Sequence, residues 1–166
     1  MSIAASIVVL AALASGCTNS PVGRKCDLGE APPANAVAVA SQSLDCVSRT
    51  CLRVGGGAGY PPTRELPPGS TPLAANVGLC TAECASSDEC ERVPESPCVL
   101  GFTCAIATTA GPYCCRKFCI CKDYVAVPES GELAAPAECD ATESKNACCN
   151  LDGRRGSPNP DYSLCK

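Results

Sequence analysis

The segment Tyr113-Cys-Cys-Arg-Lys-Phe-Cys-Ile-Cys-Lys122, YCCRKFCICK, carries four cysteines. Such clusters hold soft metals as thiolates, carry out redox exchange or form disulfides, and the local sequence fits all three chemistries. Adjacent cysteines rarely bond each other, because disulfide geometry strains the small ring between them. If oxidised, Cys114 and Cys115 should therefore bond two separate partners, as should Cys148 and Cys149.

The composition of the whole chain favours disulfides. Seventeen of the 166 residues are cysteine, which is typical of disulfide scaffolds in secreted chains. Large core side chains are scarce, with no Trp, two Phe and four Tyr, whereas 14 Gly and 15 Pro supply many turns. Because such a chain buries little apolar area, crosslinks must help to offset the entropy of folding. We predict a small, disulfide-rich, loop-rich fold, mostly β, with short hairpins and helical turns.

Several kinds of site are excluded or disfavoured. The chain has no His, which excludes Ser-His-Asp and Cys-His catalysis and imidazole metal sites. Its net charge of −4 and the lack of a basic run argue against nucleic acid. The carboxylate pairs Asp88-Glu89 and Asp123 with Glu129 are interpreted as surface charges. Residues Asp140–Asn146 alternate oxygen side chains like a calcium loop but lack its glycine and final glutamate, so we interpret them as a polar turn.

A short apolar segment opens the chain. Residues Ile3–Ala14, IAASIVVLAALA, suit the hydrophobic region of a secretory signal and are too few to span a bilayer. The sequence Leu13-Ala-Ser-Gly-Cys17, LASGC, resembles the lipobox of bacterial lipoproteins. The resemblance implies cleavage between Gly16 and Cys17 and makes Cys17 the lipidation site. Ordinary signal cleavage after Ala14 is the alternative.

The same resemblance implies a compartment. Lipoproteins of this type usually carry three acyl chains, and several chains hold a protein firmly to a membrane. Thr18, rather than Asp, follows the lipid site, which in such lipoproteins implies transfer to the outer membrane. The body of the protein should then face the periplasm or the cell surface, where disulfides persist.

The organisation of the chain follows from these assignments. Residues 1–16 are the predicted signal peptide, 17–25 a lipidated tether and 26–166 a disulfide-rich domain with a Gly/Pro-rich loop at 55–79. If Cys17 carries lipid, sixteen cysteines remain for eight disulfides, whereas an unmodified Cys17 leaves one thiol over. The predicted disulfide cysteines are Cys26, Cys46, Cys51, Cys80, Cys84, Cys90, Cys98, Cys104, Cys114, Cys115, Cys119, Cys121, Cys139, Cys148, Cys149 and Cys165.

These sixteen cysteines fall into three groups. The segment Cys26–Cys51 holds three, Cys80–Cys121 holds nine and Cys139–Cys165 holds four. An odd set cannot pair fully within itself, so full pairing requires at least one disulfide that leaves the first segment. We therefore expect a single, covalently integrated unit rather than independent domains.

Local patterns predict a few elements. Residues Asn35–Leu44 alternate weakly and fit a strand, although their alanines also permit a helix. Ser86 with Glu89 three residues later resembles a capping box and predicts a helical turn near Cys90.

The segments Cys98–Ala107 and Tyr113–Val127 flank the sequence TTAGP and predict a hairpin. Cys119 and Cys121 would then share one face of its second strand, and Cys114 and Cys115 would point to opposite faces.

Two weaker resemblances suggest functions. Five residues separate Cys84 from Cys90, and three residues separate the later pair Cys114-Cys115 from Cys119. This cysteine spacing is similar to that of the whey-acidic-protein, or four-disulfide-core, inhibitors. That similarity implies a protease inhibitor. The Cys-Cys and Cys-x-Cys pairs beside Lys resemble the cysteine motifs of metallothioneins. That resemblance implies sequestration of a soft metal.

The function that we favour is a non-enzymatic one. We predict a binding, interaction or structural module of the cell envelope, held to the membrane by its N-terminal lipid, with no cofactor and an envelope or extracellular protein as partner. The Gly/Pro-rich stretch Gly55–Pro72 is the expected display loop. Protease inhibition and soft-metal sequestration are the alternatives.

Overall fold

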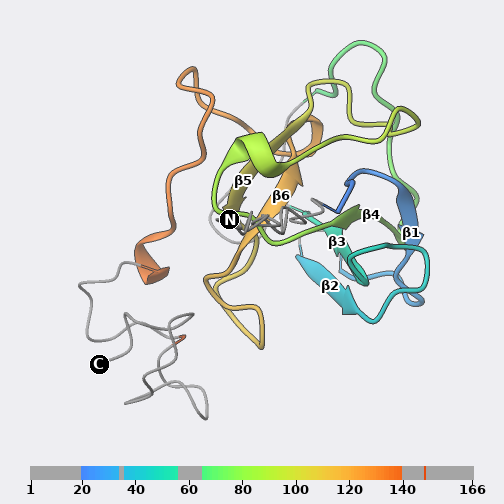
Figure 1. Cartoon of the computed structure of the whole chain (residues 1–166), viewed down its shortest axis with the longest axis horizontal. Coiled ribbons are helices and arrows are strands. Elements are labelled where there is room, and N and C mark those ends of the chain that lie inside the picture. The colour runs from blue at the N-terminus through green and yellow to red at the C-terminus, as the bar shows by residue number, and fades with distance from the viewer. Residues whose placement is uncertain (1–19, 34–35, 56–64, 140–147, 149–166) are drawn as a thin grey trace, which may run out of the picture.

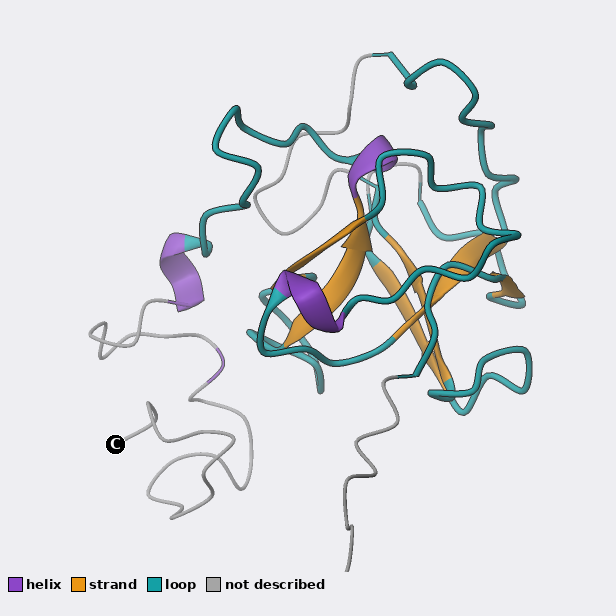
Figure 2. Ribbon diagram, turned by 45° about the horizontal axis from the view of Figure 1, so that its top comes forward, coloured by secondary structure: helices purple, strands orange, loops and turns teal. Residues whose placement is uncertain are grey.

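Six short strands and three single-turn 3-10 helices form the regular structure of the computed structural model, which describes residues 20–33, 36–55, 65–139 and 148. The strands are β1 Lys25–Asp27, β2 Ala38–Ser41, β3 Thr50–Arg53, β4 Val77–Thr81, β5 Phe102–Ile106 and β6 Lys117–Cys121, and the helical turns are η1 Ser87–Glu89, η2 Lys122–Tyr124 and η3 Ala137–Cys139. The fold is small and mostly β, as predicted. Figures 1 and 2 show the two sheets beside each other.

The first sheet has four antiparallel strands in the order β1-β4-β3-β2. The segment that fitted either a strand or a helix forms strand β2, which pairs with β3 from Ala38↔Arg53 to Ser41↔Thr50. β4 lies between β1 and β3, with Gly78 opposite Cys26 and Cys80 opposite Cys51. A side chain at Gly78 would meet the Cys51 sulfur at 2.8 Å, so the Cys26–Cys51 disulfide passes over β4 where β4 has no side chain.

The predicted hairpin is the second sheet, in which β5 and β6 are antiparallel. The predicted strand boundaries were too wide. The second strand begins at Lys117, and Cys114 and Cys115 lie in the turn before it, where Cys115 has a φ of 59°. The Cys115 amide closes this turn by donating to the Thr108 carbonyl at 2.8 Å. The expectation that Cys114 and Cys115 alternate along a strand is therefore wrong.

The chain between the two sheets joins them by hydrogen bonds. Glu83, just beyond β4, bridges Phe118 of β6, and the Cys119 amide donates to the Ala82 carbonyl at 3.0 Å. The buried Thr81 hydroxyl also donates to the Cys119 carbonyl at 2.8 Å. β6 therefore has a backbone neighbour on both edges, whereas β5 pairs with β6 alone among the strands of the described residues.

The predicted helical turn is present at η1, but its capping differs from the prediction. The Ser86 side chain makes no cap hydrogen bond. The Glu89 carboxylate instead accepts from the Ala85 amide at 2.8 Å, and the Ser87 hydroxyl accepts from the Cys104 amide of β5 at 3.0 Å. Glu89 therefore caps the turn locally, whereas the expected serine cap is replaced by a contact with β5 that local sequence does not reveal.

Both faces of β6 are buried, which explains how so few large side chains make a core. Phe118 and Ile120 pack with Leu52 of β3 on one face. Cys119 and Cys121 lie together on the other with Leu79, as the alternation predicted. Each face therefore combines a small apolar cluster with the strands of the first sheet.

Candidate binding surface

Seven disulfides cross-link the described part of the chain and use fourteen of the sixteen predicted cysteines. Cys149, Cys165 and the predicted lipidation site Cys17 lie outside the described residues, as do Asp140–Asn146. The bond Cys46–Cys80 leaves the first segment, as full pairing of an odd set requires. The pairs are Cys26–Cys51, Cys46–Cys80, Cys84–Cys104, Cys90–Cys119, Cys98–Cys121, Cys114–Cys148 and Cys115–Cys139.

The adjacent cysteines of the opening segment behave as branching points. Cys114 bonds Cys148, and Cys115 bonds Cys139. The two bonds adjoin, with 2.8 Å between the sulfurs of Cys148 and Cys115. One short turn is thereby tied to two positions further along the chain.

Sulfurs from neighbouring disulfides form three groups in the described residues, one of them at this turn. Within each of these groups the sulfur atoms lie within 4.8 Å of one another. Thiolates are the form of cysteine that binds soft metals, and each of these sulfurs is already bonded to another sulfur. In this oxidised state the groups act as crosslinks. The groups are Cys26, Cys46 and Cys80; Cys84, Cys90 and Cys119; and Cys114, Cys115 and Cys148.

The prediction for Asp123 is wrong. The sequence predicts a surface charge there, but the side chain is fully buried. The carboxylate accepts from the amides of Val99 and Leu100 at 2.7 and 2.8 Å, and from the Ser70 hydroxyl. A charged group can be buried here because hydrogen bonds replace its water shell. Glu129, the other member of the pair, is exposed as expected.

The residues around Asp123 fix one end of the Gly/Pro-rich loop. Besides the Ser70 contact, the Tyr124 hydroxyl donates to the Thr71 carbonyl at 2.9 Å. Burial raises the pKa of Tyr124, the nearby Asp123 charge raises it further, and Arg53 opposes the rise. Part of the expected display loop is thus held against the hairpin.

Large apolar side chains are exposed at two turns. Leu44 and Val47, in the turn between β2 and β3, are 85% and 72% exposed. Leu100, in the turn held by Asp123, is 56% exposed and borders a shallow hollow of about 540 Å³. Single exposed apolar residues are common on protein surfaces and do not by themselves define a site.

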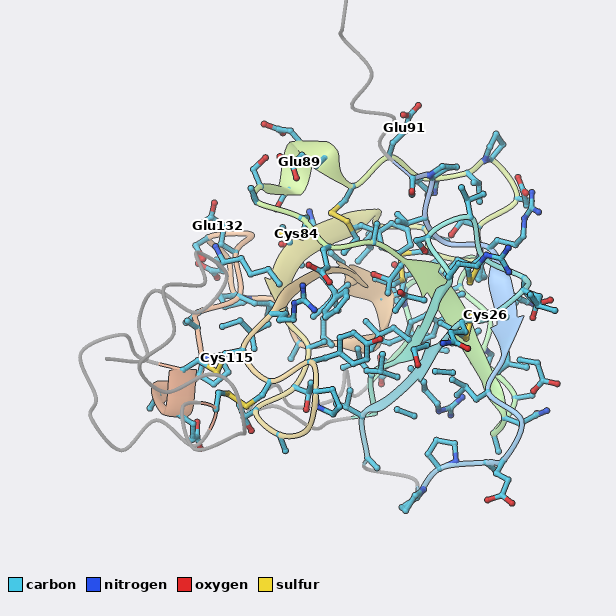
Figure 3. All side chains as sticks on the ribbon, turned by 60° about the horizontal axis from the view of Figure 1, so that its bottom comes forward. Cys26, Cys84, Glu89, Glu91, Cys115 and Glu132 are labelled. Atoms are coloured by element: carbon cyan, nitrogen blue, oxygen red, sulfur yellow. A yellow bond between two sulfur atoms is a disulfide. The ribbon has the colours of Figure 1, made fainter. Side chains whose placement is uncertain are left out.

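A second hollow, called the groove below, lies beside the β5–β6 hairpin. Its floor is Cys104–Ile106 of β5, and its volume is about 340 Å³. Residues 85–88 at η1 form one wall, and Glu132, Leu133 and Ala135 contribute to the other. In Figure 3, Glu132 lies to the left of Cys84, and the η1 turn with Glu89 lies above it. Sequence reasoning did not find this groove, because its parts come from three separate segments.

Neither a known protein family, a curated protein nor a solved structure matches this chain. In the described part of the chain, no helix has the length and apolar character needed to cross a membrane.

Proposed function

We propose that this protein is a lipid-anchored, non-enzymatic binding module of the bacterial outer membrane. The observation that carries the proposal is the distribution of the crosslinks, because five of the six described strands contain a disulfide cysteine. Such a body keeps a fixed surface without a large apolar core. Preorganised surfaces bind with less loss of conformational entropy, which suits recognition.

The lipid anchor rests on the sequence LASGC and on cysteine parity. Fourteen cysteines are paired, so only Cys17, Cys149 and Cys165 are left. If Cys17 is acylated, the last two complete an eighth disulfide and no thiol remains. An oxidising compartment is consistent with that full pairing.

The intact mass of the membrane-extracted protein tests this proposal, measured with and without thiol alkylation before reduction. We expect a chain beginning at Cys17, carrying three acyl chains and no alkylated thiol. Peptide mapping should recover a Cys149–Cys165 bond. An unlipidated chain, or one with several reactive thiols, would contradict the proposal.

Three variants separate lipidation from sorting. Cys17→Ser should abolish acylation and release the protein from the membrane fraction. Thr18→Asp should remain acylated but stay in the inner membrane, whereas the matched Thr18→Ser should reach the outer membrane. Equal distribution of the two Thr18 variants would reject outer-membrane sorting.

Soft-metal sequestration is the second candidate, supported by the grouping of sulfurs from neighbouring disulfides. It requires thiolates, and therefore reduced cysteines. Metal analysis of the protein purified without reductant, together with a thiol count, distinguishes the candidates. Bound metal with free thiols would favour sequestration, whereas a metal-free protein without free thiols would favour the binding module.

A further inference from the structure

Among the described residues, no strand pairs with the edge of β5 that faces away from β6. Ile106, at the end of this edge, packs with Cys139 and Cys148 and is only 6% exposed. The Cys104 amide points away from β6, because it donates to the Ser87 hydroxyl at 3.0 Å. Backbone direction alternates along an antiparallel strand, so the Ile106 amide and the carbonyls of Cys104 and Ile106 also point away from β6. No described residue is hydrogen-bonded to these three groups. Such an edge is a template for another strand.

The groove of about 340 Å³ borders this edge. Its volume is at the low end for ligand pockets, roughly 300–1,000 Å³, and suits a short length of extended chain. The η1 wall is fixed in place by the Cys84–Cys104 disulfide and by the bond from the Ala85 amide to Glu89. The site is therefore preorganised on its η1 side.

The charges at the groove indicate what kind of segment it accepts. Asp88 and Glu132 are exposed in its walls, and neither has an ion-pair partner among the described residues. Lys117 is the single basic residue in the lining. Two carboxylates and one amine leave an excess of one negative charge, which is complementary to a basic side chain.

We propose that this groove binds an extended basic segment of a partner protein, which adds to β5 as a further strand at Cys104–Ile106. Main-chain hydrogen bonds supply affinity in this mode, and the flanking side chains supply selectivity. Here Asp88 and Glu132 select Lys or Arg in the incoming strand. The inference rests on the proposed function as a binding module and names the class of its partner.

The test uses the full, oxidised chain labelled with ¹⁵N and an acetylated hexapeptide of alternating Val and Arg. Peptide addition should shift the amide signals of residues 85–88, 104–106 and 132–135. Hydrogen exchange at the Ile106 amide should slow by at least about tenfold at saturation. The same peptide N-methylated at every residue should not slow it, because methyl groups on both of its edges prevent strand pairing.

Charge variants test selectivity. Asp88→Lys with Glu132→Lys should weaken peptide binding at least about tenfold. The matched control is Glu91→Lys with Glu129→Lys, which makes the same charge change at exposed residues outside the groove lining and should have little effect. Equal weakening by both pairs would show general charge attraction and overturn the proposal.

Other occupants of the edge give different results. If the Ile106 amide is already protected in the free monomer, the chain covers its own edge and the proposal fails. If the protein dimerises through residues 104–106, a second copy is the occupant and the proposal also fails. The mass of the lipidated chain does not involve the groove, so loss of peptide binding alone would reject the groove and leave the anchored module standing.

Discussion

The two-sheet body and the C-terminal arm use disulfides in different ways. The body comprises the described residues from 20 to 125, and the arm comprises residues 128–139 with Cys148. In the body, Cys26–Cys51 and Cys98–Cys121 cross-link a framework of hydrogen-bonded strands. The arm contains no strand and lies to one side of the two sheets (Figure 1). Crosslinks therefore reinforce existing structure in the body, whereas in the arm they substitute for it.

The body and the arm also differ in how far their apolar side chains are buried. Phe118 and Ile120 are almost completely buried in the body. The arm adds half-buried Leu133 at the edge of that cluster, and its cysteines Cys139 and Cys148 pack with Ile106. We therefore expect the body to unfold cooperatively around its core and the arm to depend on its two bonds.

Complete reduction should have the largest effect. Each native disulfide typically contributes roughly 2–4 kcal/mol, and the scarce aromatic core offers little replacement. We expect the reduced, alkylated chain to lose its β-sheet circular dichroism and its protease resistance in both regions. A reduced body that stayed compact would show that strand pairing and apolar packing suffice there, and would confine the role of the crosslinks to the arm.

Removing one bond from each region gives the sharpest comparison. Cys98–Cys121 and Cys115–Cys139 close loops of similar length, with separations of 23 and 24 residues. Loop entropy alone predicts nearly equal losses. We expect C98A/C121A to lower the free energy of unfolding of the body by about 2–5 kcal/mol. C115A/C139A should leave the thermal midpoint of the body nearly unchanged and open new cleavage sites within residues 128–139.

Thermal unfolding followed by circular dichroism measures the first effect, and limited proteolysis with mass spectrometry locates the second. Similar losses of body stability in both double variants would mean that the arm folds as part of the same cooperative unit.

The contrast between the regions also explains what could be predicted from sequence. The hairpin of β5 and β6 was predictable, because its alternation and turn residues are local. Counting the cysteines predicted that at least one disulfide would link the first segment to another part of the chain. It could not predict that this disulfide would be Cys46–Cys80. Burial of Asp123 depends on Ser70, far away in sequence, and on the turn at Val99, so no local pattern reveals it. Pairing partners and the groove depend likewise on tertiary contacts.

Two glycines offer a test of smaller effect. A methyl group at Gly78 would come within 2.8 Å of the Cys51 sulfur and of the Leu52 carbonyl oxygen. Gly78→Ala should therefore destabilise the body by about 1–3 kcal/mol, the usual cost of overpacking. Gly131 of the arm has open space around it and a φ of 78°, so Gly131→Ala strains only its own backbone.

Denaturant unfolding of the two glycine variants provides the measurement. The midpoint for the body should fall in Gly78→Ala and remain close to wild type in Gly131→Ala. An unchanged midpoint in Gly78→Ala would mean that the Cys26–Cys51 bond can shift away from β4.

The smallest expected effect concerns an exposed ion pair of the body, in which Arg24 lies 3.1 Å from Glu95. A hydrogen bond from its own backbone amide lowers the pKa of Glu95, and Arg24 lowers it further. The folded state therefore favours the ionised carboxylate, so the stabilisation is present above the ordinary pKa of about 4.5 and is lost as the pH falls below it.

Exposed pairs contribute little, so Glu95→Gln should lower the thermal midpoint at pH 7 by at most about 1 °C. At a pH well below 4.5 the variant and the wild type should melt together, and cleavage of the arm should not change at either pH. A difference that persisted in acid would assign the effect to packing rather than to charge.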